Sequence, residues 1–193
     1  MVRSRAAGLF ALVTISSVWL CAQAAHPRAI DTERSTMTIH VYRSGVFSFA
    51  GDNHEIRAPI AAGTVDDGKQ SVEISVDASK LKVLDPKMSD DKRAQVQQKM
   101  LSPEVLDPEK FPEIRFRSTK VEQKGSAGLA VTGDLTLHGQ THPVVVNVSG
   151  KGDHYTGKAA VKQTEFGMKP VTVGGGTVKV KDEVEIEFAI VTQ

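Results

Sequence analysis

The chain has 193 residues, with 24 basic against 23 acidic side chains, one cysteine and 5% aromatic residues. The formal net charge of +1 disfavours a nucleic-acid-binding protein, which normally carries a clear basic excess. One cysteine excludes an intramolecular disulfide framework and a cysteine-rich zinc site. The length favours one domain, and a hydrophobic content of 40% is typical of a globular protein. The core of that domain has few bulky aromatic side chains to fill it.

Residues 1–24 have the three parts of a secretory signal peptide. Two arginines within the first five residues precede an apolar stretch over 6–20, and the Ala-Gln-Ala at 22–24 supplies the small residues that a signal peptidase reads. The apolar stretch is about 15 residues long, shorter than the roughly 20 that span a bilayer. We therefore expect a periplasmic or secreted protein whose mature domain is 25–193. An uncleaved membrane anchor and a lipidated Cys21 are the alternatives.

Several stretches of the mature chain alternate apolar and polar residues, the pattern of a strand with one buried face. The last stretch is the clearest, because Val184, Ile186 and Phe188 alternate with glutamates. In chain order, the predicted strands include residues 36–42, 72–77, 113–117, 129–137 and 178–190.

Turn signals separate the predicted strands, and short connections favour antiparallel neighbours. Gly139-Gln140 suits a two-residue hairpin whose first central residue has a positive φ. The turn signals are Ser44-Gly45, Asp67-Gly68, Lys124-Gly125, Gly139-Gln140 and Gly152-Asp153.

One segment, residues 89–107, has a helical pattern instead. Ser89 is the expected N-cap, acidic residues occupy the first turn, and Pro103 and Pro108 end the helix. With about eight antiparallel strands in roughly 160 residues around this insert, the pattern predicts a barrel or a sandwich. Apolar residues recur on one face of the helix at 96, 100 and 101.

Three segments carry a resemblance to a known family. Residues 131–144 read VTGDLTLHGQTHPV, residues 111–116 read FPEIRF, and TEFGM at 164–168 is followed by VKDEVEI at 180–186. In this order and spacing they resemble the YceI-like family of lipocalin-fold, polyisoprenoid-binding proteins. The family's patterns are G-x-L-T-hydrophobic-H-G-x-T-x-P-V and (F/Y)-P-x-I-x-F. Gln163 stands where many members carry an arginine.

The resemblance implies an all-β fold, an eight-stranded antiparallel lipocalin-like barrel with a short helical insert between the early and late strands. It further implies a long apolar cavity that holds a polyisoprenoid or an isoprenoid-quinone-type lipid. The protein would then be a carrier or reservoir for that apolar lipid, with no catalytic residues, no metal and no other cofactor.

An eight-stranded barrel either packs its own interior or holds one small ligand. The shortage of aromatic residues favours a cavity, because small β-branched side chains fill less of a barrel. The alternative for each of these apolar side chains is ordinary packing in a filled core. The predicted cavity-lining residues are Ile39, Val41, Phe47, Phe49, Ile74, Val76, Phe116, Leu135, Leu137, Phe166 and Phe188, with Met100 and Leu101 of the insert, next to Val96, closing one end.

Other kinds of site have weaker support. His138 and His142 are four residues apart, but Gly139 and Pro143 exclude the helix that would place both on one metal ion. The glycines at 174–176 lack the Lys-Ser/Thr of a phosphate loop, and no Gly-x-Ser-x-Gly nucleophile motif is present.

Two other functions stay open at this point. An enzyme acting on a lipid-like substrate would need Arg43, His54 or Glu165 turned into the barrel. An envelope stress-related interaction module would instead have a filled interior. The basic face of the insert, with Lys92, leaves a transient contact with anionic membrane lipid open, and a homodimer is open too.

Overall fold

The computed structural model describes most of the chain that follows residue 25. The leader predicted over 1–24 and the predicted lining residues Phe47 and Phe49 lie outside the described ranges. These ranges are residues 26–44, 53–125, 128–173 and 178–193.

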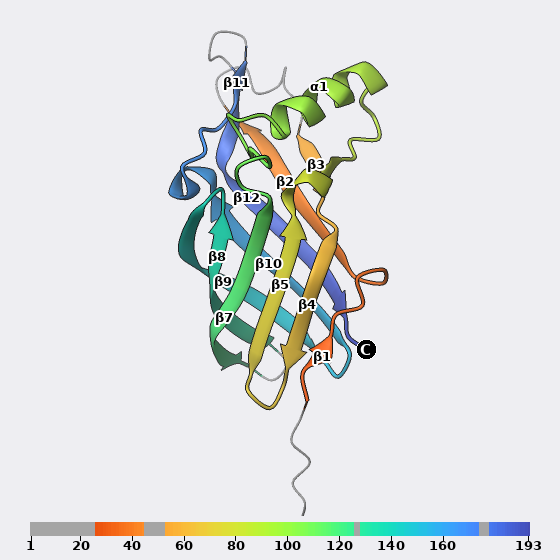
Figure 1. Cartoon of the computed structure of the whole chain (residues 1–193), viewed down its shortest axis with the longest axis vertical. Coiled ribbons are helices and arrows are strands. Elements are labelled where there is room, and N and C mark those ends of the chain that lie inside the picture. The colour runs from red at the N-terminus through yellow and green to blue at the C-terminus, as the bar shows by residue number, and fades with distance from the viewer. Residues whose placement is uncertain (1–25, 45–52, 126–127, 174–177) are drawn as a thin grey trace, which may run out of the picture.

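The described chain forms one antiparallel sheet that curls into a barrel, with one α-helix across its upper end (Figure 1). The strands are β1 (Arg28–Ala29), β2 (Thr36–Ser44), β3 (His54–Arg57), β4 (Ile60–Asp66), β5 (Ser71–Asp77), β6 (Lys82–Val83), β7 (Glu113–Lys124), β8 (Gly128–Leu137), β9 (Gln140–Lys151), β10 (His154–Lys162), β11 (Thr172–Val173) and β12 (Val178–Val191). The helices are α1 (Asp90–Met100) and the 3-10 turns η2 (Ala78–Lys80) and η3 (Gln163–Phe166).

The strand pairings follow one open path, and the chain itself completes the ring where β3 continues into β4. β12 pairs with β2, β2 pairs with β3, and β3 leads through Ala58-Pro59 into β4. From β4 the ring continues through β5, β7, β8, β9 and β10 back to β12. Beyond the bend, the gap between β4 and β12 is bridged by β1, which pairs with β4, and by Ile30, which pairs with Thr192.

This arrangement confirms the all-β, barrel-like fold but not the number of strands. The described residues form twelve strands rather than eight. Proline has no N–H to continue a ladder, so Pro59 divides one long strand into β3 and β4. The two-residue strands β1, β6 and β11 add short pairings along the longer ones.

The turn between β8 and β9 lies one residue earlier than predicted. β8 ends at Leu137 and β9 begins at Gln140, so the central residues are His138 and Gly139, with φ of 50° and 73°. Two positive φ values define a turn whose twist matches that of the flanking strands. His138 is held there because its Nδ1 donates to the carbonyl oxygen of Phe166 at 3.2 Å and its ring lies 4.5 Å from the ring of Phe111.

Helix α1 begins where the acidic first turn predicted it and ends at Met100, before Pro103. The predicted N-cap Ser89 occupies that position but makes no capping hydrogen bond through its side chain. The side chain of Gln97 fixes the helix to the barrel, because it accepts from the N–H of Val83 at 2.8 Å and donates to the carbonyl of Leu81 at 2.9 Å. None of the described helices is both long and apolar enough to cross a bilayer.

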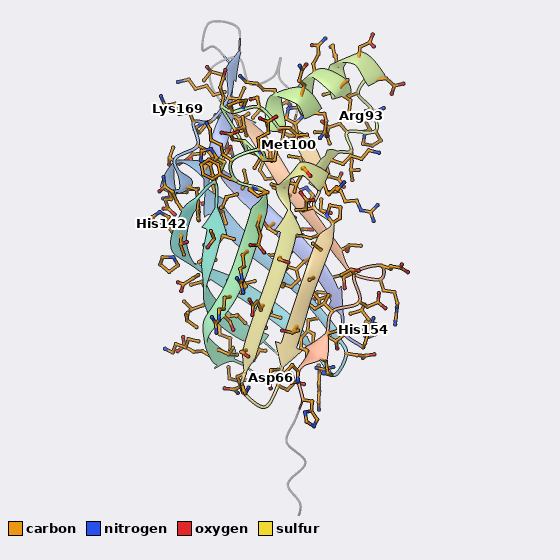
Figure 2. All side chains as sticks on the ribbon, viewed as in Figure 1. Asp66, Arg93, Met100, His142, His154 and Lys169 are labelled. Carbon is orange, nitrogen blue, oxygen red and sulfur yellow. The ribbon has the colours of Figure 1, made fainter. Side chains whose placement is uncertain are left out.

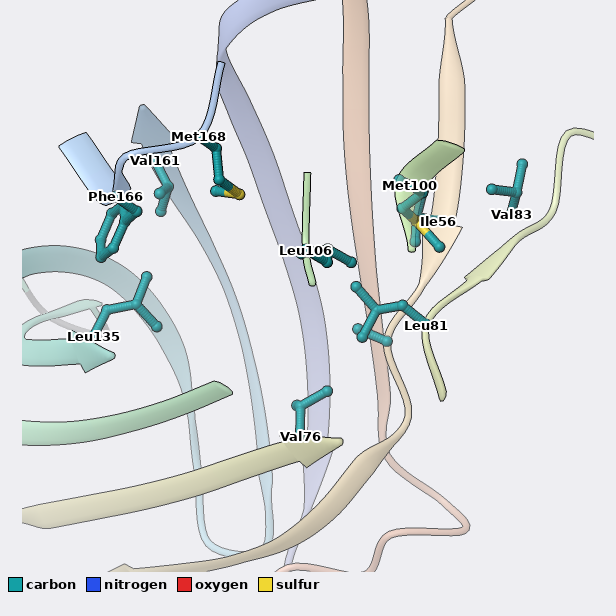
Figure 3. Packing of buried hydrophobic residues seen from close by; sticks show 11 residues of the cluster. Ile56, Val76, Leu81, Val83, Met100, Leu106, Leu135, Val161, Phe166 and Met168 are labelled. Atoms are coloured by element: carbon teal, nitrogen blue, oxygen red, sulfur yellow. The ribbon is translucent and has the colours of Figure 1, made fainter. Parts of the chain in front are cut away.

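The larger of two buried clusters lies beneath α1 (Figure 3). Met100 meets Ile56 and Leu81 on one side of it, while Phe166 lies beside Leu135 and Val161 on the other. A smaller cluster at the opposite end contains Ile30, Ile60, Val65 and Ile190. The packed core therefore occupies the two ends of the barrel more than its middle.

Candidate functional site: an apolar cavity along the barrel

The inward faces of the strands enclose a cavity of about 790 Å³. Its lining comes from each of the long strands β2, β4, β5, β7, β8, β9, β10 and β12, and from α1. Most of these residues are aliphatic, so the cavity is apolar along most of its length. Its volume falls within the range of about 300–1,000 Å³ that is usual for small-molecule sites.

The structure brings most of the predicted lining residues together. Phe166 lies elsewhere: its side chain is 0% exposed and packs at the rim, where its ring stands edge-on to His142 at 5.2 Å. Leu101, which caps the C-terminus of α1, packs against the buried cluster instead of the cavity. The predicted residues that line the cavity are Ile39, Val41, Ile74, Val76, Met100, Phe116, Leu135, Leu137 and Phe188.

The sequence interpretation missed the contribution of β9 and β10, where Val146, Val148 and Ala159 also line the cavity. On β9 the inward residues alternate with outward ones, but one of those outward residues is Val145, whose side chain is 51% exposed. A valine on the wet face gave a continuous apolar run, which hides period-two alternation. Val146 pairs with the buried Val131 of β8, and paired residues point to the same side of a sheet, so Val146 also faces inward.

Two phenylalanine rings lie against glycines in the barrel wall. Phe188 lies over its cross-strand partner Gly157, and Phe116 lies over Gly133. A Cβ atom on either glycine would overlap the ring. Glycine in a strand permits such a close approach. These two rings therefore lie flat against the wall and leave the middle of the barrel open.

Replacing Gly157 with valine is expected to force the Phe188 ring off the wall and to lower the free energy of unfolding by about 1–3 kcal/mol. Phe188→Leu should restore part of this loss, which a double-mutant cycle in urea would measure. Ala160→Val, on the outer face of the same strand, is the matched control and should change stability little. Additive effects of the substitutions at 157 and 188 would contradict the contact.

At the α1 end, the cavity is lined by polar and basic side chains. His54 is oriented there by Asp85, since its Nδ1 donates to Asp85 Oδ2 at 2.6 Å while Asp85 Oδ1 accepts from the N–H of Glu55 at 2.8 Å. The charged and polar lining residues at this end include Arg43, His54, Lys92, Gln95, Lys99 and Lys179. Of the three side chains that an enzyme would turn inward, Arg43 and His54 line the cavity and Glu165 is exposed.

At the opposite end, a hydrogen-bonded network ties four elements together. The Arg28 guanidinium contacts Asp67 at 2.7 Å, Tyr155 at 3.0 Å and Thr192 at 2.6 Å. Partial burial pulls the pKa of Arg28 down, but the hydrogen bond to Tyr155 and the charge of Asp67 outweigh it and raise the pKa above its ordinary value. Arg28 therefore stays charged and fastens β1 to the β4–β5 turn, to β10 and to the end of β12.

The histidines do not form a metal centre in the described part of the chain, where no three His, Cys, Asp or Glu side chains come together as ligands. His138 and His142 both contribute to packing of the β8–β9 hairpin against η3. That the protein works without a metal stays a prediction.

An antiparallel barrel around an apolar cavity is the architecture of a lipocalin-like barrel protein. The sequence matches the YceI-like domain over residues 29–192, so the chain belongs to this family.

The individual relatives share about a third of their residues with this chain, over part of its length. A UPF0312 protein of Vibrio cholerae is 31% identical over 114 residues, covering 54% of this chain and 59% of the relative. A UPF0312 protein of Shewanella denitrificans is 33% identical over 135 residues, which is 65% of each chain. These matches thus span about three-fifths of the relatives' length. The crystal structure of BcnA from Burkholderia cenocepacia has a TM-score of 0.58 and 20% identity, covers 85% of this chain and 99% of that chain, and shares the fold.

Proposed function

We propose that this protein is an exported lipid-binding protein that holds a polyisoprenoid or isoprenoid-quinone-type lipid in the barrel and acts as its carrier or reservoir. The observation that carries the proposal is the apolar cavity of about 790 Å³ that extends along the barrel. Export rests on the leader sequence of residues 1–24. The alternative, an interaction module, predicts a barrel interior filled by its own side chains instead of a cavity.

The energetics of burial suit a long apolar chain. Each methylene transferred from water into an apolar site contributes about 0.8 kcal/mol, so a few isoprene units are enough for firm retention. Branched isoprene units also match a lining made mainly of valine, isoleucine and leucine side chains. No charged anchor is required for this affinity.

Binding without turnover is part of the proposal. In the described part of the chain, His54 hydrogen-bonds to Asp85 and to no hydroxyl group, so the pair has no serine or threonine nucleophile beside it. Glu165, the second acid–base candidate, is exposed in η3. The polar groups at the cavity are better suited to contacting a ligand than to transforming it.

Native mass spectrometry of the protein purified from its own host, followed by lipid extraction, tests the proposal. We expect a bound species with the mass of an isoprenoid lipid, released on denaturation. A lipid-free protein that also fails to take up an added isoprenoid quinone would refute the proposal.

A further inference from the structure

The charges that line the cavity are unevenly distributed between its two ends. At the α1 end the charged lining residues are Arg43, Lys92, Lys99 and Lys179, and no Asp or Glu is among the described lining residues there. At the opposite end the lining includes Asp66 and Asp67. The charged lining residues are therefore basic at one end and acidic at the other.

The basic residues come from three elements that meet at this end (Figure 1). The end of β2 pairs with the start of β12, with Arg43 opposite Val180 and Ser44 opposite Lys179. Lys92 and Lys99 are seven residues apart on α1 and share a helix face with the lining residues Val96 and Met100. Figure 2 shows α1 and its side chains, with Met100 labelled, at the end of the barrel opposite to Asp66.

Nearby carboxylates neutralise only part of this charge. Glu104 forms an ion pair with Lys99, and Asp85 is engaged by His54. No ion pair joins Lys92 or Lys179 to a carboxylate of the described residues. Lys92 and Lys179 thus keep their positive charges at the α1 end of an apolar cavity.

The acidic end is unsuited to an anion. Asp67 is already paired with Arg28. Asp66 is 4% exposed, accepts from the N–H of Lys69 at 3.0 Å and forms an ion pair with the Lys69 side chain at 3.8 Å. An anionic group placed there would lie next to two carboxylates and would have to break the Arg28 network. An amphiphile with a negative head group would therefore enter the cavity in one orientation, tail towards Asp66 and head towards α1.

We propose that the ligand is a single-tailed amphiphile with an anionic head group, bound by Lys92 and Lys179 at the α1 end while its tail fills the barrel. This head-group proposal rests on the proposed function, which places the apolar tail in the barrel, and it adds the chemical class of the head group. Lysine and arginine bind phosphate and carboxylate oxygens through charge-assisted hydrogen bonds. Because Lys92 and Lys179 are exposed, their contribution is screened by water and weakens with salt.

Calorimetric titration with two probes that differ only in the head group tests this proposal: geranylgeraniol, which is neutral, and geranylgeranyl monophosphate. We expect the monophosphate to bind about tenfold more tightly at low salt, a ratio that decreases as NaCl is added. The double variant Lys92→Gln/Lys179→Gln should reduce the ratio of the two affinities to about twofold without weakening the binding of geranylgeraniol. Lys124→Gln/Lys151→Gln removes the same charge from exposed positions outside the cavity and should keep the full ratio.

The outcomes separate the head-group proposal from the proposed function. Equal affinity of the wild-type protein for both probes, or an unchanged ratio in the Lys92/Lys179 variant with an unchanged melting temperature, would overturn the head-group proposal alone. Failure to bind either probe would refute the proposed function. If inorganic phosphate bound as tightly as geranylgeranyl monophosphate, the site would be one for free phosphate, and the proposal of an amphiphilic ligand would be overturned.

Discussion

Replacing Ala159 with tryptophan is expected to weaken the binding of an isoprenoid chain roughly fiftyfold while leaving the barrel folded. Ala159 lines the cavity from β10, where it pairs with Ile186 of β12 and with Val146 of β9. An indole at this point would displace at least about three methylenes of the ligand, each contributing about 0.8 kcal/mol. Calorimetric titration with geranylgeraniol measures the loss.

The neighbouring residue supplies a matched control. Ala160 is exposed on the outer face of the same strand, opposite Glu185, so Ala160→Trp should leave the affinity unchanged. Thermal unfolding distinguishes a hollow interior from a packed one, since overpacking a filled core costs about 1–3 kcal/mol. A lower melting temperature for Ala159→Trp, or wild-type affinity in that variant, would contradict a ligand-sized cavity at this position.

Replacing Phe166 with alanine is expected to lower the free energy of unfolding by about 3–5 kcal/mol. Phe166 has 0% exposure and belongs to the buried cluster under α1, so its removal leaves an unfilled space in packed structure (Figure 3). It does not line the cavity, so the affinity for geranylgeraniol below the melting temperature should stay the same. Urea denaturation and calorimetric titration measure the two quantities.

The same substitution at Phe188 is the comparison that separates stability from binding. The Phe188 ring is half-buried and faces the cavity, so Phe188→Ala should cost less stability than Phe166→Ala and should alter ligand affinity. Equal losses of stability in the two variants would contradict the distinction between the packed cluster and the open interior.

The strands that could be predicted from the sequence are those with one clean wet face. On β12 the glutamates between Val184, Ile186 and Phe188 all point outward, so local alternation was enough. On β9 it was not, because Val145 is apolar and exposed. The turn after Leu137 was displaced by one residue because His138 adopts a positive φ that contacts from Phe111 and Phe166 stabilise, and both of these lie far from it in the chain.

The predicted site was likewise only partly determined by local sequence. Alternation shows which side of a strand is buried, but both a packed core and a cavity present aliphatic side chains to the inside. Phe166 and Phe188 each follow a glutamate in the sequence, yet Phe166 lies in η3 and is fully buried while Phe188 lies against Gly157. The cations at the α1 end come from three separate elements, so no local pattern connects them.

Periodicity and motif spacing determined the all-β class, the position of the helix and the family resemblance, because each depends on residues close together in the chain. Only the tertiary structure decided how Pro59 and Ile30 help to close the ring, how much of the interior stays open and which end is basic. The aromatic shortage suggested a roomy barrel. The contacts of Phe116 with Gly133 and of Phe188 with Gly157 showed that these two rings are kept against its wall, since such contacts arise only when neighbouring strands come together.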